Sequence, residues 1–124
     1  MGDNFVYLNV NPLGLTEQDC VVRAISLGTG TDYQTVIDLL VQTGYEHKCE
    51  TLCVCCYSNL IENYFKFKRV EVENQTAKEL AKIHPYGIFL IRMSGHLSCM
   101  INGKVMDIWD CSEEPITDCW MVES

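Results

Sequence analysis

The sequence predicts an α+β fold in which N-terminal helices pack on a C-terminal antiparallel sheet. Apolar residues recur at helical spacing over residues 20–27 and 33–40, and a third helical pattern covers 50–65. From residue 65 onward, segments alternate between apolar and polar residues, which is typical of half-buried strands. Helices followed by strands indicate an α+β domain. The 124 residues contain no linker or repeat, so we expect a single domain over residues 1–124.

The first half of the chain is expected to form one short strand and then three helices. Local signals set the boundaries, because Asp and Thr side chains cap helix N-termini and glycine ends helices. Thr16 and Asp19 are both candidate caps for the first helix. The expected elements are a strand at 5–8, a helix from Cys20 that stops at Gly28-Thr29-Gly30, a helix that Asp32 caps and Gly44 ends, and a helix at 50–65. For the last of these, an extended portion over residues 52–56 is the alternative.

The second half is expected to form the sheet and one more short helix. Thr76 and Glu79 have the spacing of a capping box, which predicts that this helix begins directly after Thr76. Asn102-Gly103 between two apolar segments is the strongest short signal for a hairpin. The expected strands are alternating segments at 65–68 and 70–73, a buried strand at 87–91, hairpin strands at 96–101 and 104–109, and a last strand at 119–122.

Charge and hydropathy argue against two classes of partner. The chain has 9 Lys and Arg against 17 Asp and Glu, a net charge of −8, so we expect no binding to nucleic acid. No apolar run approaches the ~20 residues of a membrane-spanning helix, so we expect no membrane partner. The first ten residues carry no basic export signal, which favours a cytoplasmic protein whose eight cysteines stay reduced.

Two segments far apart in the chain hold the residues of an activated thiol. Asp19-Cys20 starts the first helix, and Gly95-His96 starts a strand. A helix N-terminus carries partial positive charge, which favours a thiolate over a thiol. A histidine can take the thiol proton, and a carboxylate can orient that histidine. The pattern therefore predicts Cys20 as nucleophile, His96 as base and Asp107 as the orienting carboxylate.

The hairpin register decides between two carboxylates for the third role. A two-residue turn at Asn102-Gly103 places Asp107 on the same face as His96 and within reach of it. Asp110 falls on the opposite face, but a one-residue change in turn length would exchange the two, so Asp110 remains the rival. The expected pairs are Ile101 with Lys104, Met100 with Val105, Cys99 with Met106 and Ser98 with Asp107.

Two blocks of the sequence contain the three candidate residues. They are Asp19-Cys20-Val21-Val22-Arg23-Ala24-Ile25 and the segment from Gly95-His96-Leu97 through Asn102-Gly103 to Asp107-Ile108-Trp109-Asp110. Together the blocks resemble small papain-like cysteine peptidase-related proteins of bacteria and phages. They are more distantly similar to the C39 peptidases that process bacteriocins, and the NlpC/P60 peptidases share the Asp-Cys start. The resemblance implies a papain-like fold and a cysteine peptidase or amidase. Such an enzyme acts on a peptide or protein through an acyl-thioester, without a cofactor.

Some positions depart from the papain-like pattern. These enzymes place a Gln upstream of the Cys to help bind the oxyanion, and Gly14 stands at that position here. Gln18 and Asn11 are substitutes by chemistry, and the backbone N–H of Cys20 offers one donor in any case. The Ser-Gly that follows Asp-Cys in NlpC/P60 enzymes is also missing, so peptidoglycan is not implied as substrate. The alternative is a catalytically inactive papain-like module that binds a partner through its cleft.

A cysteine-rich segment offers a third interpretation, a zinc-binding protein. Cys49, Cys53, Cys55 and Cys56 lie close together with His47 nearby, and zinc takes four Cys or His ligands. Structural zinc sites usually draw their ligands from two separated pairs, and no second pair of this spacing is present. Adjacent Cys55 and Cys56 are expected to point apart on a helix. We therefore expect buried, reduced cysteines here and no bound metal.

Overall fold

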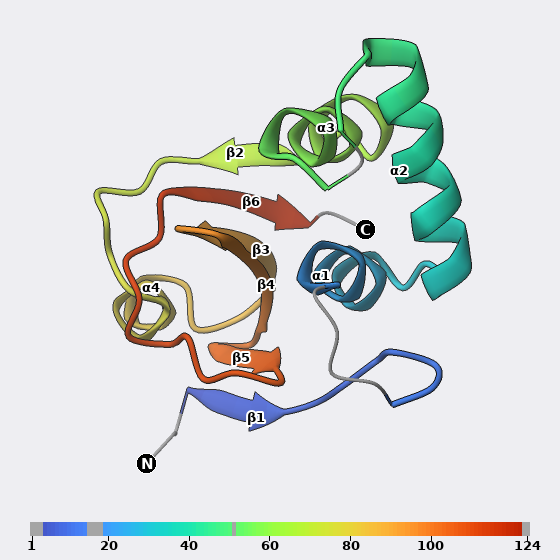
Figure 1. Ribbon diagram of the computed structural model, residues 1–124. Coiled ribbons are helices and arrows are strands. Elements are labelled where there is room, and N and C mark those ends of the chain that lie inside the picture. Colours follow the sequence, from blue (N-terminus) through green and yellow to red (C-terminus); the bar gives the residue numbers. More distant parts are fainter. Residues whose placement is uncertain (1–3, 15–18, 51, 123–124) are drawn as a thin grey trace.

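The computed structural model describes residues 4–14, 19–50 and 52–122. These ranges form a mixed α/β arrangement of four α-helices, one turn of π-helix and a six-stranded sheet (Figure 1). No helix in these ranges combines the length and the apolar composition needed to cross a bilayer. The elements are β1 (Phe5–Tyr7), α1 (Cys20–Thr29), α2 (Tyr33–His47), α3 (Val54–Asn59), the π-turn η1 (Leu60–Tyr64), β2 (Lys68–Val70), α4 (Ala77–Ile83), β3 (Ile88–Met93), β4 (His96–Ile101), β5 (Lys104–Asp107) and β6 (Asp118–Val122).

The sheet has the strand order β1-β5-β4-β3-β6-β2 over the described residues. Its neighbours are antiparallel except at one edge, where β1 runs parallel to β5 with Val6 opposite Met106. The sheet is therefore mixed, which corrects the expectation of an antiparallel sheet built by the C-terminal half alone. Parallel neighbours need a long connection. The chain between β1 and β5, which contains all the described helices, supplies it.

Helices lie on both faces of a strongly curved sheet (Figure 1). Helix α4 lies on the concave side and contacts β5. Helix α1 lies against β4 and β3 on the other side, and α2 packs on α1 and α3. The expected packing of N-terminal helices on the sheet is thus present, with α4 added on the opposite face.

Helix α1 begins at Cys20, as predicted, and approaches the sheet closely. A Cβ built on Gly28 would lie 2.9 Å from Leu90 Cδ2 and 3.4 Å from Cys99 Sγ, so the helix backbone packs here only because residue 28 has no side chain. This contact fixes α1 against β3 and β4. It therefore also fixes Cys20 relative to the strand that begins at His96.

Helix α2 confirms its predicted start and corrects its predicted end. The side chain of Asp32 accepts a hydrogen bond from the backbone N–H of Thr35, as an N-cap does. The helix does not stop at Gly44, which is buried inside it, but continues to His47. Lys48 then ends it in the left-handed conformation with φ 54°. A buried glycine is tolerated within this helix because tertiary packing outweighs its low propensity.

The later boundaries agree with the sequence in part. The capping box of Thr76 and Glu79 is present, and α4 follows it. The third helix begins at Val54 rather than at residue 50. Only Lys68–Val70 is a strand where two alternating segments were expected, because this edge pairs with β6 over three residues.

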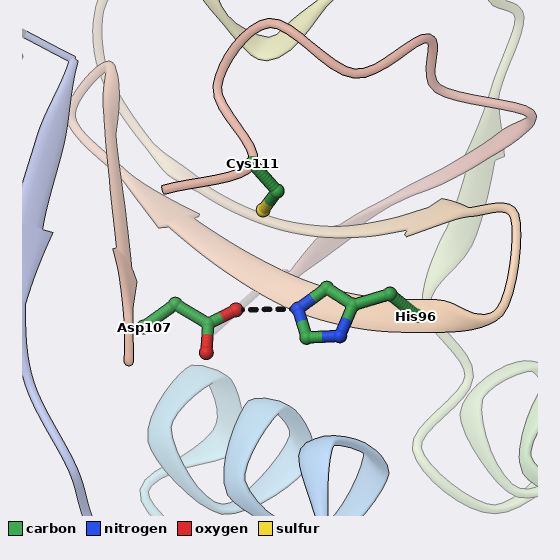
Figure 2. Close-up of side chains that lie close together, drawn as sticks. All are labelled: His96, Asp107 and Cys111. Atoms are coloured by element: carbon green, nitrogen blue, oxygen red, sulfur yellow. Dashed lines mark hydrogen bonds and ion pairs between the residues drawn. The ribbon is translucent and has the colours of Figure 1, made fainter. Parts of the chain in front are cut away.

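The β4–β5 hairpin has the predicted turn and register. Asn102 and Gly103 both have positive φ, 49° and 78°, as a type I′ turn requires. The turn brings the start of β4 and the end of β5 together, so that His96 and Asp107 face each other (Figure 2). The observed pairs nearest the turn are Ile101 with Lys104 and Met100 with Val105.

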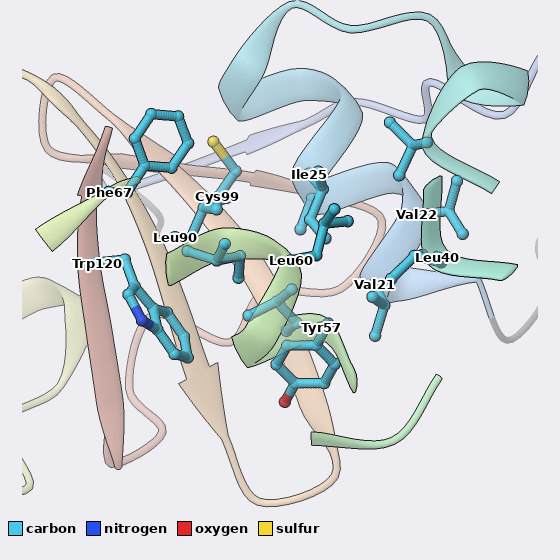
Figure 3. Packing of buried hydrophobic residues seen from close by; sticks show 14 residues of the cluster. Val21, Val22, Ile25, Leu40, Tyr57, Leu60, Phe67, Leu90, Cys99 and Trp120 are labelled. Carbon is cyan, nitrogen blue, oxygen red and sulfur yellow. The ribbon is translucent and has the colours of Figure 1, made fainter. Parts of the chain in front are cut away.

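Two clusters of buried apolar side chains lie on opposite faces of the sheet. Alternation along β3 divides them, since Leu90 enters the cluster under α1 and α2 while Phe89 and Ile91 enter the cluster under α4. Tyr57 and Trp120 lie within the first cluster (Figure 3), edge to face with ring centroids 6.5 Å apart. Buried polar side chains also occur, and those that belong to the site below are Asp19, Arg23, Ser98 and Asp107.

Candidate active site

A cleft of about 550 Å³ opens at the N-terminus of α1. Cys20, the first residue of α1, and His96, the first residue of β4, both line this cleft. Both are partly exposed, so a ligand in the cleft meets a thiol and an imidazole together. Much of the remaining wall is apolar or aromatic and includes Leu52, Val54, Tyr57, Ile108 and Trp109.

Two neighbours orient the ring of His96. Its Nε2 lies 2.7 Å from Oδ2 of Asp107 (Figure 2). The indole of Trp109 packs edge to face on the imidazole, with ring centroids 5.0 Å apart and an interplanar angle of 79°. Because Nε2 faces the carboxylate, Nδ1 is the nitrogen left for the thiol of Cys20. The carboxylate and the indole therefore hold the ring with Nδ1 turned away from Asp107.

The carboxylate of Asp107 accepts hydrogen bonds on both oxygens. Oδ2 accepts from Ser98 Oγ at 2.6 Å in addition to facing His96. Oδ1 accepts from Arg23 Nη1 at 2.8 Å and from the backbone N–H of Ile108 at 2.7 Å. Burial alone would raise the pKa of this carboxyl, but the bonds from His96, Ser98 and Arg23 lower it to about 2. Asp107 is thus ionised at neutral pH.

Arg23 connects the first turn of α1 to the end of β5. Its Nε donates to Asp19 Oδ1 at 2.6 Å while its Nη1 donates to Asp107. Asp19 in turn accepts from the Tyr33 hydroxyl at 2.6 Å and from the Asn11 amide at 2.9 Å. Asp19 stands at the N-cap position of α1 but makes no capping bond with its side chain. Its carboxylate holds Arg23 instead, so the residue before Cys20 serves the network behind the site.

The two residues predicted to bind the oxyanion are Asn11 and Gln18. The amide of Asn11 is buried and donates to Asp19 and, at 3.4 Å, to Tyr33 Oη. Asn11 is not among the residues that line the cleft. An oxyanion role does not fit this placement, because both amide hydrogens point into the network of Asp19. Gln18 lies outside the described residues.

The electrostatics of Cys20 favour the thiolate. Burial raises the pKa of this thiol, but a hydrogen bond to His96 and one to the backbone of Leu97 act in the opposite direction. The positive charges of His96 and Arg23 add to that effect, and the net pKa lies below its ordinary value of 9.0.

The electrostatics of His96 favour the imidazolium. Burial lowers the pKa of the ring, and the hydrogen bonds to Asp107, Cys111 and Cys20 outweigh burial and raise it to about 11. The two directions are consistent with each other, since a thiolate and an imidazolium stabilise one another. Both shifts favour a Cys20 thiolate paired with a His96 imidazolium.

A second thiol lies on the far side of the His96–Asp107 pair. Cys111 is completely buried, and its sulfur points toward the gap between the other two side chains (Figure 2). His96, Asp107 and Cys111 each offer one possible metal-ligand atom, and in the described part of the chain these three atoms all lie within 4.8 Å of one another. The set suits a metal poorly, because a protonated imidazole cannot coordinate and a closed zinc site takes four ligands.

The structure thus places Cys20 and His96 in one cleft and Asp107 on His96, while their catalytic roles stay a prediction. The rival Asp110 accepts hydrogen bonds from the backbone and side chain of Ser112 instead. Sequence reasoning missed Arg23, although Arg four residues after Asp19 is the spacing of a helical ion pair. No family model, curated protein or solved structure matches this chain.

Proposed function

We propose that this protein is a papain-like cysteine hydrolase, a peptidase or amidase with Cys20, His96 and Asp107 as its triad. The observation that carries the proposal is that Cys20 and His96 line one cleft, while Nε2 of His96 is hydrogen-bonded to Asp107. A lowered thiol pKa and a raised imidazole pKa support it. Nucleophile, base and orienting carboxylate are the three parts that acyl transfer by a thiol requires.

The chemistry proceeds in two halves. The Cys20 thiolate attacks the carbonyl carbon of an amide, and the resulting oxyanion is held by the backbone N–H of Cys20. The carbon–nitrogen bond breaks as His96 gives its proton to the leaving amine, which leaves an acyl-thioester on Cys20. His96 then takes a proton from water, whose oxygen attacks the thioester. The carboxylic acid leaves, and the thiolate–imidazolium pair is restored.

A papain-like frame is supported by the placement of the reacting groups. The nucleophile begins a helix that packs on the sheet, the histidine begins strand β4, and the carboxylate ends the neighbouring strand β5. The two sequence blocks that resemble papain-like proteins are the same two that meet in this site. Papain-like sites also accept a neutral Asn as the third member of the triad. Asp107 instead gives His96 a partner with a full negative charge.

The substrate class we propose is a peptide or protein with an apolar group next to the scissile bond. Leu52, Val54 and Ile108 offer apolar walls, and Trp109 and Tyr57 offer aromatic ones. The triad uses no cofactor. We further propose that the enzyme works in the cytoplasm, a reducing compartment that suits a chain whose eight cysteines are all free over the described structure.

A second candidate function is an inactive papain-like module that binds a peptide in the same cleft. Two observations favour it. Gly14 stands where papain-like enzymes carry the Gln that binds the oxyanion, and Asn11 does not replace that Gln because its amide is bonded to Asp19. Trp109, 46% exposed beside His96, is a suitable contact for a bound peptide.

Hydrolysis of a complex peptide mixture tests the proposal. The reduced wild-type protein should generate new peptide termini and accumulate a thioester on Cys20 that hydroxylamine removes. Cys20→Ala should abolish both, whereas Cys53→Ala, which removes another thiol of lowered pKa, should retain both. Peptide binding without new termini or a thioester would reject the hydrolase and support the binding module.

A further inference from the structure

Four cysteines form a chain of thiol contacts between the end of α2 and the first turn of α3. The sulfur atoms of Cys53 and Cys55 are 2.7 Å apart. Cys49 hydrogen-bonds to both Cys55 and Cys56. Cys55 is exposed while Cys56 is buried, so the two adjacent side chains face different surroundings, as expected on a helix. None of these thiols belongs to the Cys20 site.

The backbone around the pair permits a covalent bond. Val54, between the two cysteines, is helical. Ideal helix geometry then separates the Cα atoms of Cys53 and Cys55 by about 5.4 Å. Disulfides need a Cα separation of about 4.4 to 6.8 Å. The two sulfurs already touch, so a bond between them requires a small side-chain movement rather than a refolded segment.

The two thiols differ in a way that suits stepwise exchange. Hydrogen bonds from Cys55 and from the backbone N–H of Cys56 lower the pKa of Cys53, so this thiol is the attacking one. The hydrogen bond to Cys53 raises the pKa of Cys55 to about 11, because Cys55 is then the donor. Once Cys53 is bound to another sulfur it carries no charge, and the main reason for the raised pKa of Cys55 disappears.

Access separates this pair from the other cysteines of the segment. Cys55 is exposed and Cys53 is partly exposed. Cys56 is buried, and its thiol donates to the backbone carbonyl of Leu40 at 3.6 Å. A reagent in solution therefore reaches Cys53 and Cys55 first.

We propose that Cys53 and Cys55 form a reversible dithiol–disulfide pair that exchanges with low-molecular-weight disulfides such as oxidised glutathione. The Cys53 thiolate attacks one glutathione sulfur, the glutathione disulfide bond breaks, and one glutathione thiolate leaves. Cys55, deprotonated by solvent, then attacks the sulfur of Cys53 and releases the second glutathione. The protein dithiol loses two electrons and two protons, and oxidised glutathione becomes two molecules of reduced glutathione.

The Cys53–Cys55 pair lies next to the cleft that holds Cys20. Leu52 and Val54, on either side of Cys53, line the cleft that holds Cys20. The disulfide would thus form within the wall of that cleft. The proposal itself concerns the thiols alone and stands whether or not the cleft is catalytic.

Intact mass spectrometry with oxidised glutathione tests the proposal. The probe protein is the full chain carrying Cys20→Ala, so that the thiol in the cleft cannot react. It should lose two hydrogen atoms without retaining glutathione, and excess reduced glutathione should restore them. Differential alkylation should assign the oxidised sulfurs to Cys53 and Cys55. Cys53→Ser and Cys55→Ser, each added to Cys20→Ala, should prevent that loss, and the Cys55→Ser protein should instead keep one glutathione on Cys53.

Matched controls distinguish this bond from others in the segment. Cys49→Ser and Cys56→Ser should still form the disulfide. Loss of two hydrogen atoms in both the Cys53→Ser and Cys55→Ser proteins would overturn the proposal, as would a glutathione adduct on the parent protein that never resolves. One equivalent of zinc bound to the reduced parent and lost on Cys53→Ser would overturn it in favour of a metal site.

Discussion

Cys20 and Cys53 are two thiols of lowered pKa beside the same cleft, and they differ in their partners. Cys20 is half buried at the start of α1 and is bonded to His96, which Asp107 supports. Cys53 is bonded to a second thiol, Cys55, and to backbone N–H groups. Both environments favour a thiolate, but by different means.

The partner determines what each thiolate can do. An imidazolium can protonate a leaving amine and later accept a proton from water, so the Cys20 site has the parts for acyl transfer. A neighbouring thiol supplies neither step efficiently but supplies a second sulfur, so the Cys53 site has the parts for disulfide exchange. A low thiol pKa alone therefore does not identify a catalytic cysteine. The chemical nature of its hydrogen-bond partner, imidazole or thiol, decides which reaction it can perform.

Removing the imidazole of His96 should have the largest effect on hydrolysis, and it should affect the Cys20 site without affecting the Cys53 site. We expect His96→Ala to lower the proposed hydrolase rate by at least about 10⁴-fold, since triad members act as a unit. Disulfide formation at Cys53 should be unchanged. Peptide hydrolysis and glutathione exchange, measured on the same preparation, check this. Equal loss of both reactions would indicate a general loss of structure instead.

Asp107→Asn should weaken the support of His96 without removing the base. We expect a rate loss of about 10- to 10⁴-fold, the upper end being that of the equivalent change in a serine-protease triad. Asp110→Asn is the matched control, because Asp110 bonds to Ser112 and should change the rate little. Steady-state kinetics of the two variants decide the matter. A larger effect from Asp110→Asn would show that the triad assignment is wrong.

Arg23→Met should destabilise the fold because it removes the guanidinium that the buried carboxylates of Asp19 and Asp107 share. We expect the free energy of unfolding to fall by about 3–5 kcal/mol. Arg69 also bonds two carboxylates, Glu62 and Asp118, but its side chain is 48% exposed. Arg69→Met should therefore cost less than about 1 kcal/mol. Urea unfolding of both variants measures the contrast, and equal losses would contradict the importance assigned to burial.

The stability supplied by the His96–Asp107 pair should depend on pH in both directions. The pKa of His96 is raised from 6.5 to about 11, so its contribution is complete below pH 6.5 and is lost as the pH rises toward 11. The pKa of Asp107 is lowered from 3.8 to about 2, so its contribution is complete above pH 3.8 and is lost as the pH falls toward 2. The pair should stabilise most between these limits.

Unfolding of the Cys20→Ala protein across this pH range measures the effect, since the thiol of residue 20 then no longer titrates. His96→Gln in the same background is the control. The difference in free energy of unfolding between the two proteins should shrink above pH 6.5. A difference that stays constant to the alkaline limit would contradict the raised pKa of His96.

Metal removal should have the smallest effect. We expect no stoichiometric zinc in the purified reduced protein and no change in unfolding temperature with EDTA. Metal binding at a structural site contributes directly to the free energy of folding, so a metal site would be visible in this measurement. Elemental analysis with thermal unfolding checks it. Unfolding on chelation would reject the dithiol interpretation of the Cys49–Cys56 segment.

Much of the site could be predicted because its signals are local. Asn102-Gly103 fixes the hairpin register, and that register selects Asp107 over Asp110 as the partner of His96. The start of α1 at Cys20 follows from an apolar helical pattern after Asp19. These features depend on turn chemistry and side-chain periodicity, which short segments contain.

The remaining features depend on contacts between distant segments. Nothing near β1 indicates that it will pair in parallel with β5. Asn11 has the chemistry of an oxyanion donor, but the positions of Asp19 and Tyr33 engage its amide elsewhere. Gly44 looks like a helix end, and packing keeps it inside α2. In each case tertiary structure overrides a reasonable local expectation.

Brief labelling with iodoacetamide at about pH 6, followed by mass mapping, tests the central claim most directly. Cys20 should be alkylated far faster than the buried thiols Cys99, Cys111 and Cys119. In the His96→Ala protein, labelling of Cys20 should fall sharply while labelling of Cys53 stays the same. Two results would contradict the thiolate–imidazolium pair and with it the proposed hydrolase. One is a Cys20 that is not labelled in the wild type, and the other is labelling of Cys20 at the same rate in the wild type and in His96→Ala.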